Sequence, residues 1–319
     1  MSFLKNKSIL VTGGAGFVGT NLIRALLPLG CHISATFNRR LPRIVDSGID
    51  FVRGDLTDRN FCRNAVKGID YVFMCAANSS GASVMEEKPL THVTPNVIMN
   101  SLMLEAAYEA GVKKFLFISS TTVYPLSDSP VKECDLLTAP VFDKYFCVAW
   151  MKIFSEKLCE MYAKKIKKPM PVIIIRSGNL YGPEDDFEWE TSHALPALMR
   201  RAVERHDPLV IWGDGREVKD LIYIDDFIDG MLLAMEKIQD FDIINVASGE
   251  PTSLRNALNW ILRYADYEDA NVEYDLSKPQ MMPWRMVDIS KAKEVLGFQP
   301  KVSLAEGIKR TIDWYKKKK

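Results

Sequence analysis

The chain has 319 residues, of which 47% are hydrophobic and 26% charged, with 41 basic against 41 acidic side chains. This length is about that of two domains, and the balanced charge argues against a protein that binds nucleic acid or a membrane surface. No apolar stretch is long enough to span a bilayer, and residues 1–7 lack the apolar segment of a signal peptide, so we expect a cytoplasmic protein.

The first predicted strand ends in three spaced glycines, which are followed by a helical pattern. In such a turn Gly13 takes backbone angles closed to other residues, Gly16 lets a pyrophosphate approach the main chain, and Gly19 lets the helix lie close to the strand. The start of the helix, at Phe17 and Val18, then presents unpaired N–H groups to the phosphates. We therefore expect dinucleotide binding here, and a purely structural glycine turn is the alternative.

The second predicted strand, residues 31–37, follows a Pro-x-Gly stop, and its end bears on the choice of cofactor. A carboxylate at this point binds the ribose 2′-hydroxyl of NAD, but the sequence has Asn38, Arg39 and Arg40. Two guanidinium groups suit a 2′-phosphate, so among the NAD(P)(H) cofactors we favour NADP(H). The alternatives are that both arginines lie on a solvated loop and that NAD binds through Asn38.

The third and fourth predicted strands, residues 49–52 and 71–75, end in short polar or small side chains. Strand ends on this side of a parallel sheet face the cofactor. Asp55, followed by Leu56, is therefore a candidate for contact with the adenine amino group. Ala76 and Ala77 are small enough to let the nicotinamide ribose pass.

A cluster of hydroxyl groups follows the fifth predicted strand, residues 115–118. It includes Ser120 and Thr122, and so many hydroxyls at one strand end suggest a reacting carbonyl or alcohol nearby, although buried hydroxyls are also structural. The helical pattern at 149–164 carries Lys152 and Glu156 one turn apart.

The remaining pattern predicts a doubly wound parallel α/β sheet of about seven strands, of the Rossmann type, with an interleaved smaller α/β lobe. Further predicted elements are helices at 21–29, 96–109 and 223–235, strands at 172–175 and 243–246, an excursion out of the sheet at 184–220, and a mixed terminal lobe from 252. We expect a cofactor domain formed by 1–178 and 220–248, a substrate lobe formed by 179–219 and 249–319, and a substrate cleft between them.

The six cysteines show no paired spacing, and the four histidines do not cluster with them. We therefore expect reduced thiols and no metal site.

Over essentially its whole length the chain resembles the extended short-chain dehydrogenase/reductase family, in its NAD-dependent epimerase/dehydratase branch. The motifs that carry the resemblance occur in order at 12–19, 54–56, 76–77, 119–124, 152 with 156, 176–183 and 212–215. Within this branch the string 179–183, followed by 192–198, is similar to the GDP-L-fucose synthase-like, GDP-sugar enzymes.

The resemblance implies roles for four residues near the reacting carbon. Ser120 would hydrogen-bond the sugar oxygen, and Lys152 would hold the nicotinamide ribose and lower a neighbouring pKa. Thr122 stands where relatives place a cysteine acid/base, and His193 matches a second acid/base of epimerising members.

The resemblance also implies the substrate and the assembly. Asn179, Trp212, Lys219 and Arg285 would bind the nucleotide sugar in the substrate lobe, where a basic pair suits a diphosphate. The implied function is NAD(P)-dependent hydride transfer at C4 of a GDP-linked hexose or heptose, in surface-polysaccharide sugar biosynthesis. The alternative is a cofactor-binding sensor or partner subunit with little activity. A homodimer or higher homo-oligomer through helices is also implied, with candidate faces at 96–108 and 154–161.

The resemblance has smaller departures at Lys219, which replaces an arginine, and at Arg285, which replaces a lysine, but the departure that matters most is at position 148. The family signature places a tyrosine four residues before the lysine, where its phenol moves a proton during hydride transfer, but Val148 stands here. Tyr145 lies seven residues before Lys152, on roughly the same face of a helix but about 4–5 Å further along. Losing acid/base help costs about 10²–10⁴ in rate, so a slow, altered or lost reaction is the alternative to replacement by Tyr145.

Overall fold

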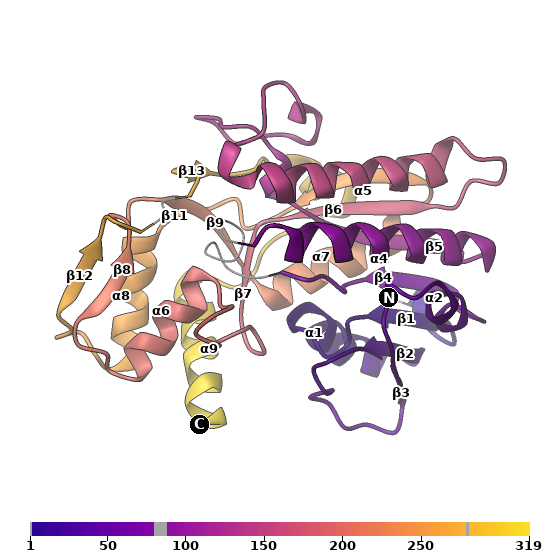
Figure 1. The fold of residues 1–319 in the computed structure, drawn as a ribbon. Coiled ribbons are helices and arrows are strands. Elements are labelled where there is room, and N and C mark those ends of the chain that lie inside the picture. The colour runs from indigo at the N-terminus through magenta and orange to yellow at the C-terminus, as the bar shows by residue number, and fades with distance from the viewer. Residues whose placement is uncertain (1, 80–87, 279–280) are drawn as a thin grey trace.

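Seven parallel strands form the central sheet, in the order β10–β6–β5–β4–β1–β2–β3 (Figure 1). The computed structural model describes residues 2–79, 88–278 and 281–319. Because parallel strands are covered on both faces, they read as nearly continuous apolar runs, as in Val172-Ile-Ile-Ile. The predicted doubly wound sheet is thus confirmed. Its strands are β1 (Ser8–Thr12), β2 (His32–Phe37), β3 (Ile49–Arg53), β4 (Tyr71–Met74), β5 (Lys114–Ser120), β6 (Val172–Ser177) and β10 (Phe241–Val246).

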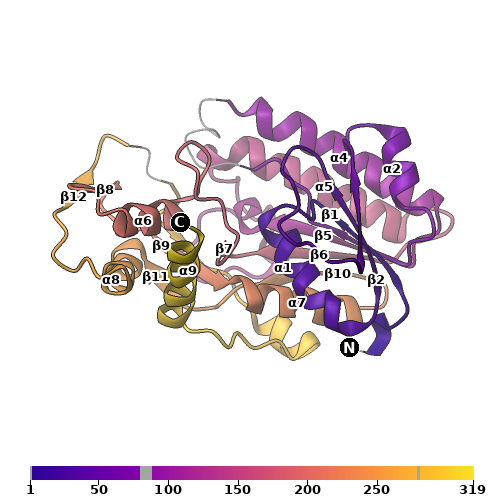
Figure 2. The ribbon, with the colours of Figure 1, turned by 90° about the horizontal axis from the view of Figure 1, so that it is seen from below.

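Helices cover both faces of this sheet (Figure 2). On one face α2 (Arg59–Ala65) contacts α4 (Leu90–Glu109), which contacts α5 (Phe146–Lys164); on the other, α1 (Phe17–Leu26) contacts α7 (Ile224–Lys237). Successive side chains of a strand point to opposite faces, so β1 feeds two separate cores. Ile9 packs in the core that contains Leu22 of α1, and Leu10 packs in the core that contains Leu104 of α4.

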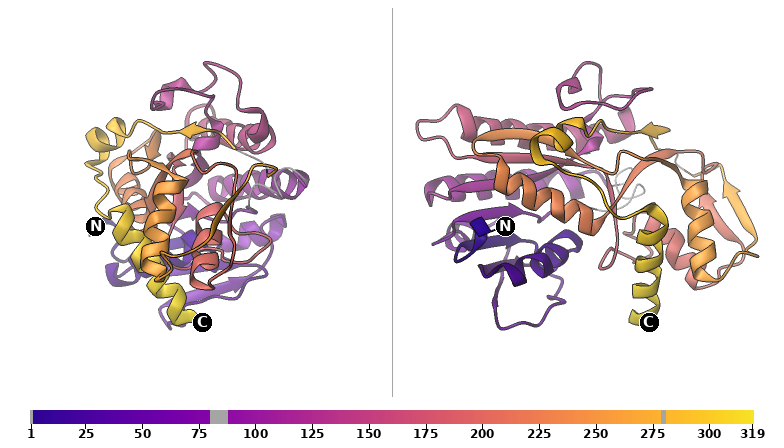
Figure 3. Two further views of the ribbon diagram at one scale, coloured as in Figure 1. Left: turned by 90° about the vertical axis from the view of Figure 1, so that its left-hand side faces the viewer. Right: turned by 180° about the vertical axis from the view of Figure 1, so that it is seen from behind.

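A smaller lobe lies beyond the carboxyl ends of the sheet strands (Figure 3, right). It contains two sheets, β11–β9–β13 with β7 paired to β9, and β12–β8, together with three helices. The chain enters this lobe after β6, returns for α7 and β10, and leaves again, so the lobe is interleaved with the sheet. Its elements are β7 (Asn179–Tyr181), α6 (Ala194–Val203), β8 (Leu209–Trp212), β9 (Val218–Tyr223), β11 (Pro251–Ser253), α8 (Leu254–Ala265), β12 (Val272–Asp275), β13 (Trp284–Arg285) and α9 (Leu304–Lys318).

Several element boundaries differ from the predicted ones. The helix predicted at 21–29 ends at Leu26 and continues as a 3₁₀ turn, because Pro28 has no N–H to donate and Gly30 takes a φ of 68°. Helix α4 begins at Leu90 rather than 96, and α5 at Phe146 rather than 149. The short helical turns are η1 (Ser2–Leu4), η2 (Leu27–Leu29), η3 (Thr121–Val123), η4 (Glu133–Asp135), η5 (Asp143–Tyr145) and η6 (Ala292–Leu296).

The domain boundaries after 178, 219 and 248 stay a prediction. Within the described ranges, no helix is both long and apolar enough to cross a membrane.

Candidate active site

The glycine turn after β1 packs closely against the end of β4 and the start of α1. Gly13 has a φ of +66°, and a Cβ on it would lie 2.8 Å from Cα of Ala76, which follows β4. A Cβ on Gly19 would lie 2.3 Å from the Gly13 carbonyl oxygen, so only glycine lets α1 approach this closely. Gly16 is the N-cap of α1, and the N–H groups of the first turn, beginning at Phe17, have no intrahelical acceptor. The cradle therefore fits a pyrophosphate.

Beside this cradle, the ends of β2 and β3 bring together Asn38, Arg39 and Asp55. The Asp55 carboxylate accepts hydrogen bonds of 2.8 Å from both the N–H and the hydroxyl of Thr57. These bonds lower the pKa of Asp55, and a hydrogen bond from Asn38 and the charge of Arg39 lower it further. Asp55 therefore stays ionised, as an acceptor for an adenine amino group requires. The Leu56 side chain is buried in the core, which leaves only its main chain for a cofactor.

Arg40 is engaged differently from Arg39. Its Nη2 lies 2.8 Å from Oδ2 of Asp186, a residue of the segment that follows β7. Two further arginines of the sheet domain, Arg24 and Arg43, both pair with Glu184 in the same segment. Three arginines thus join this segment to the cofactor side of the molecule.

At the end of β5, the predicted reactive residues lie around the start of α5. The Lys152 ammonium donates a 2.8 Å hydrogen bond to the Ile118 carbonyl, and burial lowers the pKa of Lys152 to about 8 although the charge of Glu156 opposes this shift. The Ser120 hydroxyl oxygen accepts hydrogen bonds from the N–H and the hydroxyl of Thr122, at 3.2 and 3.0 Å. Helix α5 packs against the turn that holds Thr122. The structure therefore brings Ser120, Thr122 and the helix that carries Lys152 to one strand end.

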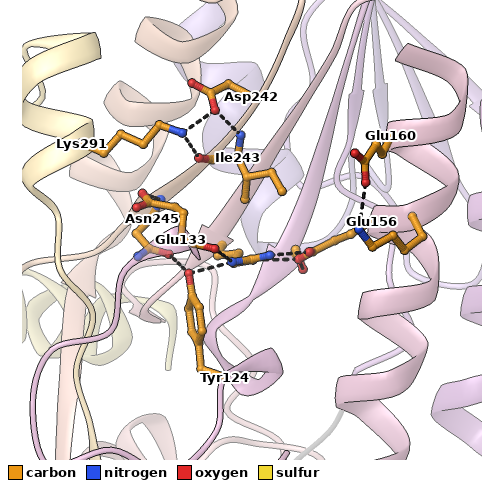
Figure 4. A network of polar contacts seen from close by, with 11 residues as sticks. Tyr124, Glu133, Glu156, Glu160, Asp242, Ile243, Asn245 and Lys291 are labelled. Carbon is orange, nitrogen blue, oxygen red and sulfur yellow. Dashed lines mark hydrogen bonds and ion pairs between the residues drawn. The ribbon is translucent and has the colours of Figure 1, made fainter. Parts of the chain in front are cut away.

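A buried polar network supports this strand end (Figure 4). Glu156 accepts two hydrogen bonds from Arg176, at 3.0 and 2.7 Å, and the Tyr124 hydroxyl accepts one from Arg176 at 2.9 Å and donates one to Asn245 at 2.6 Å. The Arg176–Glu156 pair has almost no solvent exposure, and its groups are hydrogen-bonded on both sides. The Arg176–Glu156 pair joins α5 to β6, and the bonds through Tyr124 to Asn245 extend the network to β10. Glu156 is therefore a positioning residue, and its ion-pair partner is Arg176 rather than Lys152.

Three of the four predicted substrate residues meet near Tyr145. Arg285 donates a hydrogen bond to Oδ1 of Asn179, and it is the register partner of Lys219 between β13 and β9. The Arg285 guanidinium lies 5.3 Å from the centre of the buried Tyr145 ring. Nε of Arg285 is buried and has no hydrogen-bond partner among the described residues. A buried guanidinium N–H without a partner points to a ligand group, and a diphosphate suits it.

Trp212 lies on a separate sheet from this cluster, whereas the charges of the cluster act on His193. Trp212 ends β8, on a separate two-stranded sheet, with the Lys278 ammonium 5.6 Å from its ring. His193 is the N-cap of α6 and is exposed. The surrounding protein lowers the pKa of His193 by desolvation, and Arg285 and Lys219 lower it further while Asp186 opposes them. The lowered pKa favours the neutral imidazole of His193 near pH 7.

The sequence provided no signal for His92. This histidine is buried on α4, its Nε2 has no hydrogen-bond partner among the described residues, and burial lowers its pKa. The electrostatic influence of His92 reaches His193. One turn later Asn96 exchanges hydrogen bonds with the main chain of Asn78, just beyond Ala76 and Ala77. A single histidine within a helical pattern reads as a core residue, so only the assembled structure reveals this position.

Comparison with known proteins gives a consistent set of relatives. The chain matches the NAD dependent epimerase/dehydratase family over residues 9–247. GDP-L-fucose synthase 1 of Arabidopsis thaliana is 31% identical over 318 residues, which cover 98% of this chain and 94% of that protein. GDP-L-fucose synthase of Escherichia coli (strain K12) is 29% identical, with 98% of this chain and 97% of that protein covered.

Solved structures of similar fold come from related enzymes. UDP-glucose 4-epimerase from Thermotoga maritima, solved with UDP-glucose, has a TM-score of 0.87 and 27% identity, covering 98% of this chain and 99% of that chain. UDP-glucuronic acid 4-epimerase from Bacillus cereus, solved with UDP-glucuronic acid and NAD, has a TM-score of 0.85 and 28% identity, covering 98% and 100%.

Proposed function

Since this chain belongs to the NAD-dependent epimerase/dehydratase family, whose members it matches over most of its length, we propose that it transfers a hydride between NAD(P)(H) and a GDP-linked hexose or heptose at C4. The reaction is the reduction of a 4-keto sugar, with or without epimerisation, or the oxidation of a C4 hydroxyl. Its place is the biosynthesis of surface-polysaccharide sugars. The relatives named as GDP-L-fucose synthases support the GDP-linked substrate.

The observation that carries this proposal is the Arg285 cluster, which is separate from the glycine cradle and comes from the second lobe. The cradle fits one pyrophosphate, and the unpartnered Arg285 Nε suits a second diphosphate, that of a nucleotide sugar, beside Lys219, whose ammonium pairs with Glu217. Asn179 orients the guanidinium of Arg285. One site for a dinucleotide and another for a nucleotide sugar are what hydride transfer between these two molecules requires.

When bound, the nicotinamide supplies or accepts the hydride. The residues of this chain position the reactants and move the proton. Lys152, held by the Ile118 carbonyl, presents its ammonium to the nicotinamide ribose, and Ser120 presents its hydroxyl to the sugar oxygen. Hydride transfer also needs a proton to reach or leave that oxygen, and Val148 cannot supply one.

We assign this proton to Tyr145. The 3₁₀ turn η5 ends at Tyr145 and α5 begins at the next residue, so Tyr145 caps the helix that carries Lys152. Its ring is buried between Phe142 and the Arg285 guanidinium, so the phenol is held beside the residues proposed to bind the nucleotide sugar. The other candidates are Thr122, the exposed Cys147 and a water held by Ser120. A phenol is a stronger acid than an alcohol or a water, and the thiol of Cys147, although more acidic than a phenol, is exposed to solvent rather than buried beside Arg285.

Val148 also favours a second candidate function, a cofactor-binding sensor or partner subunit with little catalytic activity. Such a protein needs only the glycine cradle and the Asp55 side of the site. The cluster of Arg285, Asn179 and Lys219 serves no purpose in a protein that binds the cofactor alone, so this function is the weaker of the two.

We expect the purified protein to change the absorbance of reduced nicotinamide when mixed with GDP-linked 4-keto sugars or GDP-sugars. Tyr145→Phe is expected to lower kcat by about 10²–10⁴, because it removes the acidic proton and keeps the ring. Thr122→Val and Cys147→Ala, the matched controls, are expected to lower kcat less. Val148→Tyr either raises kcat or is blocked by a filled pocket.

Undiminished turnover in Tyr145→Phe would assign the proton to a water or to the substrate. Turnover of UDP-sugars with none of GDP-sugars would contradict the proposed substrate. Binding of the cofactor without turnover of any nucleotide sugar would favour the sensor.

We also propose that the protein is a homodimer that uses one face of α5. Phe146, Trp150 and Phe154 recur every four residues, so they share a face, and they are 55%, 43% and 47% exposed. Three exposed aromatic side chains in a row are unusual for a monomer and suit a symmetric contact with a second copy.

A further inference from the structure

We propose that Asp186 is a cofactor-selectivity residue: as the counter-ion of Arg40 it weakens the binding of dinucleotides that carry a 2′-phosphate. The inference rests on the proposed NAD(P) function, and it concerns a residue to which neither the sequence pattern nor the family resemblance attaches a role.

The position of Arg40 makes it a candidate for the ribose 2′-position. It follows Asn38 and Arg39 directly, and these two act on Asp55 at the ends of β2 and β3. The glycine cradle lies between β1 and α1, next to β2 in the sheet. A dinucleotide in the cradle therefore has its adenosine half at the loop that carries Arg40.

Asp186 holds Arg40 through a well-defined carboxylate. Its Oδ2 accepts hydrogen bonds of 2.8 Å from both Arg40 and the Thr191 hydroxyl, and its Oδ1 accepts one from the Glu188 N–H at 3.1 Å. Burial raises the pKa of this carboxyl, but the bonds from Arg40, Thr191 and Glu188 outweigh burial, so the net pKa is lowered. The carboxylate is ionised at neutral pH and its negative charge stays beside Arg40.

This arrangement opposes a 2′-phosphate in two ways. The phosphate competes with Asp186 for the guanidinium of Arg40, and it also brings a second negative group close to the Asp186 carboxylate. A 2′-hydroxyl has neither conflict. The two arginines at 39 and 40 therefore do not act alike: Arg39 favours NADP(H), and the effect of Arg40 is reduced by its partner from the other lobe.

The test is a measurement of NADPH and NADH binding to the unmodified protein and its variants. The fluorescence of the reduced nicotinamide reports binding, and all titrations use one fixed ionic strength. Asp186→Asn keeps an acceptor for Thr191 and removes the charge. It is expected to tighten NADPH binding about three- to tenfold and to leave NADH binding within about twofold. Arg40→Ala is expected to weaken NADPH binding, and Arg40→Ala/Asp186→Asn is expected to show none of the gain.

Glu188→Gln is the matched control. Glu188 lines the same cavity of about 480 Å³ as Arg40 and Asp186. The substitution removes one negative charge from this cavity, and it keeps the Glu188 N–H that bonds Asp186 and the pair of Asp186 with Arg40. It is expected to leave the ratio of NADPH to NADH affinity unchanged.

An unchanged ratio in Asp186→Asn, or an equal gain in Glu188→Gln, would overturn the inference while the proposed function stands. A gain that persists in Arg40→Ala/Asp186→Asn would also overturn it, since the effect would then not pass through Arg40. Failure of the unmodified protein to bind either dinucleotide would overturn the proposed function and this inference with it.

Discussion

Two neighbouring carboxyl groups after β7 show how local environment sets charge at single residues. Asp186 has its pKa lowered by Arg40 and its other donors, whereas burial raises the pKa of Asp185 to about 7. The charge of Asp186 raises the pKa of Asp185 further, and the hydrogen bond from the Asp186 N–H, together with Arg43 and Arg40, offsets only part of this shift. Two adjacent residues of one type therefore differ in charge near pH 7.

Asp185 predicts a dependence of stability on pH. An unfolded aspartate has a pKa of 3.8, and the folded group has a pKa of about 7, so between these values the folded protein binds more protons. The stabilisation is complete below about pH 4 and is lost as the pH rises to 7. Asp185→Asn removes this dependence. Relative to the unmodified protein, we expect the free energy of unfolding of Asp185→Asn to gain on the order of 2 kcal/mol between pH 5 and pH 8.

Urea unfolding at the two pH values measures this difference. Asp50→Asn, at an exposed carboxylate, controls for the loss of one acidic side chain. Equal changes in Asp185→Asn and Asp50→Asn would show that burial of Asp185 has no such effect.

At the scale of elements, the site depends on where two helices begin. Helix α1 begins immediately after Gly16 and crosses the glycine turn at a distance that only Gly19 permits. Helix α5 begins at Phe146, so Tyr145 lies in the preceding turn and faces Arg285 instead of continuing the helix. The start of α1 forms the cofactor cradle. The start of α5 places Tyr145 beside Arg285, where it is the tyrosine available for proton transfer in the proposed reaction.

Gly19→Ala is expected to damage both the fold and the cradle. Its Cβ would lie 2.3 Å from the Gly13 carbonyl oxygen, so α1 must move away from β1. We expect a loss of about 1–3 kcal/mol in stability and at least about tenfold weaker NADH binding. Thermal unfolding and cofactor fluorescence measure the two effects.

Gly48→Ala is the control for Gly19→Ala, because its new Cβ would meet only the end of the flexible Asp46 side chain. If Gly19→Ala bound NADH as tightly as Gly48→Ala does, α1 would not need this close approach.

At the scale of the whole molecule, the second lobe is built from segments that leave the sheet and return to it. Its sheets and helices lie beyond the carboxyl ends of the strands (Figure 3), so cofactor residues and substrate residues come from different parts of the chain. Helix α5 lies in the outer helical layer of the sheet domain (Figure 1), and its first residue, Phe146, directly follows Tyr145.

We expect the protein in solution to have twice the mass of the 36.1 kDa chain. Trp150→Glu/Phe154→Glu places charges in the proposed contact and is expected to give a monomer by light scattering after gel filtration. Leu126→Glu, at an exposed leucine elsewhere, is expected to leave the dimer intact. A monomeric unmodified protein at micromolar concentration would contradict the proposal.

The amino-acid sequence by itself determined the sheet and the cofactor class. Buried parallel strands appear as short apolar runs between turn residues, and the cradle appears as glycines at fixed spacing, because both leave a pattern within one short segment of the chain. The family and the NAD(P)-dependent type of enzyme, inferred from these motifs, are confirmed. Helix starts were less accurate, since α4 continues through Pro95 and α5 begins with Phe146-Cys147-Val148, a run that is apolar throughout and so shows no helical periodicity.

The tertiary structure alone decided which residues meet. Arg40 and Asp186 are 146 positions apart, and Arg285 and Asn179 are 106 apart, so no local pattern relates them. The buried Nε2 of His92 likewise has no signature in its own helix. Local periodicity reports how a segment folds against a generic apolar neighbour, but the pairing of two specific polar groups depends on the path of the chain between them, which the interleaved lobe sets.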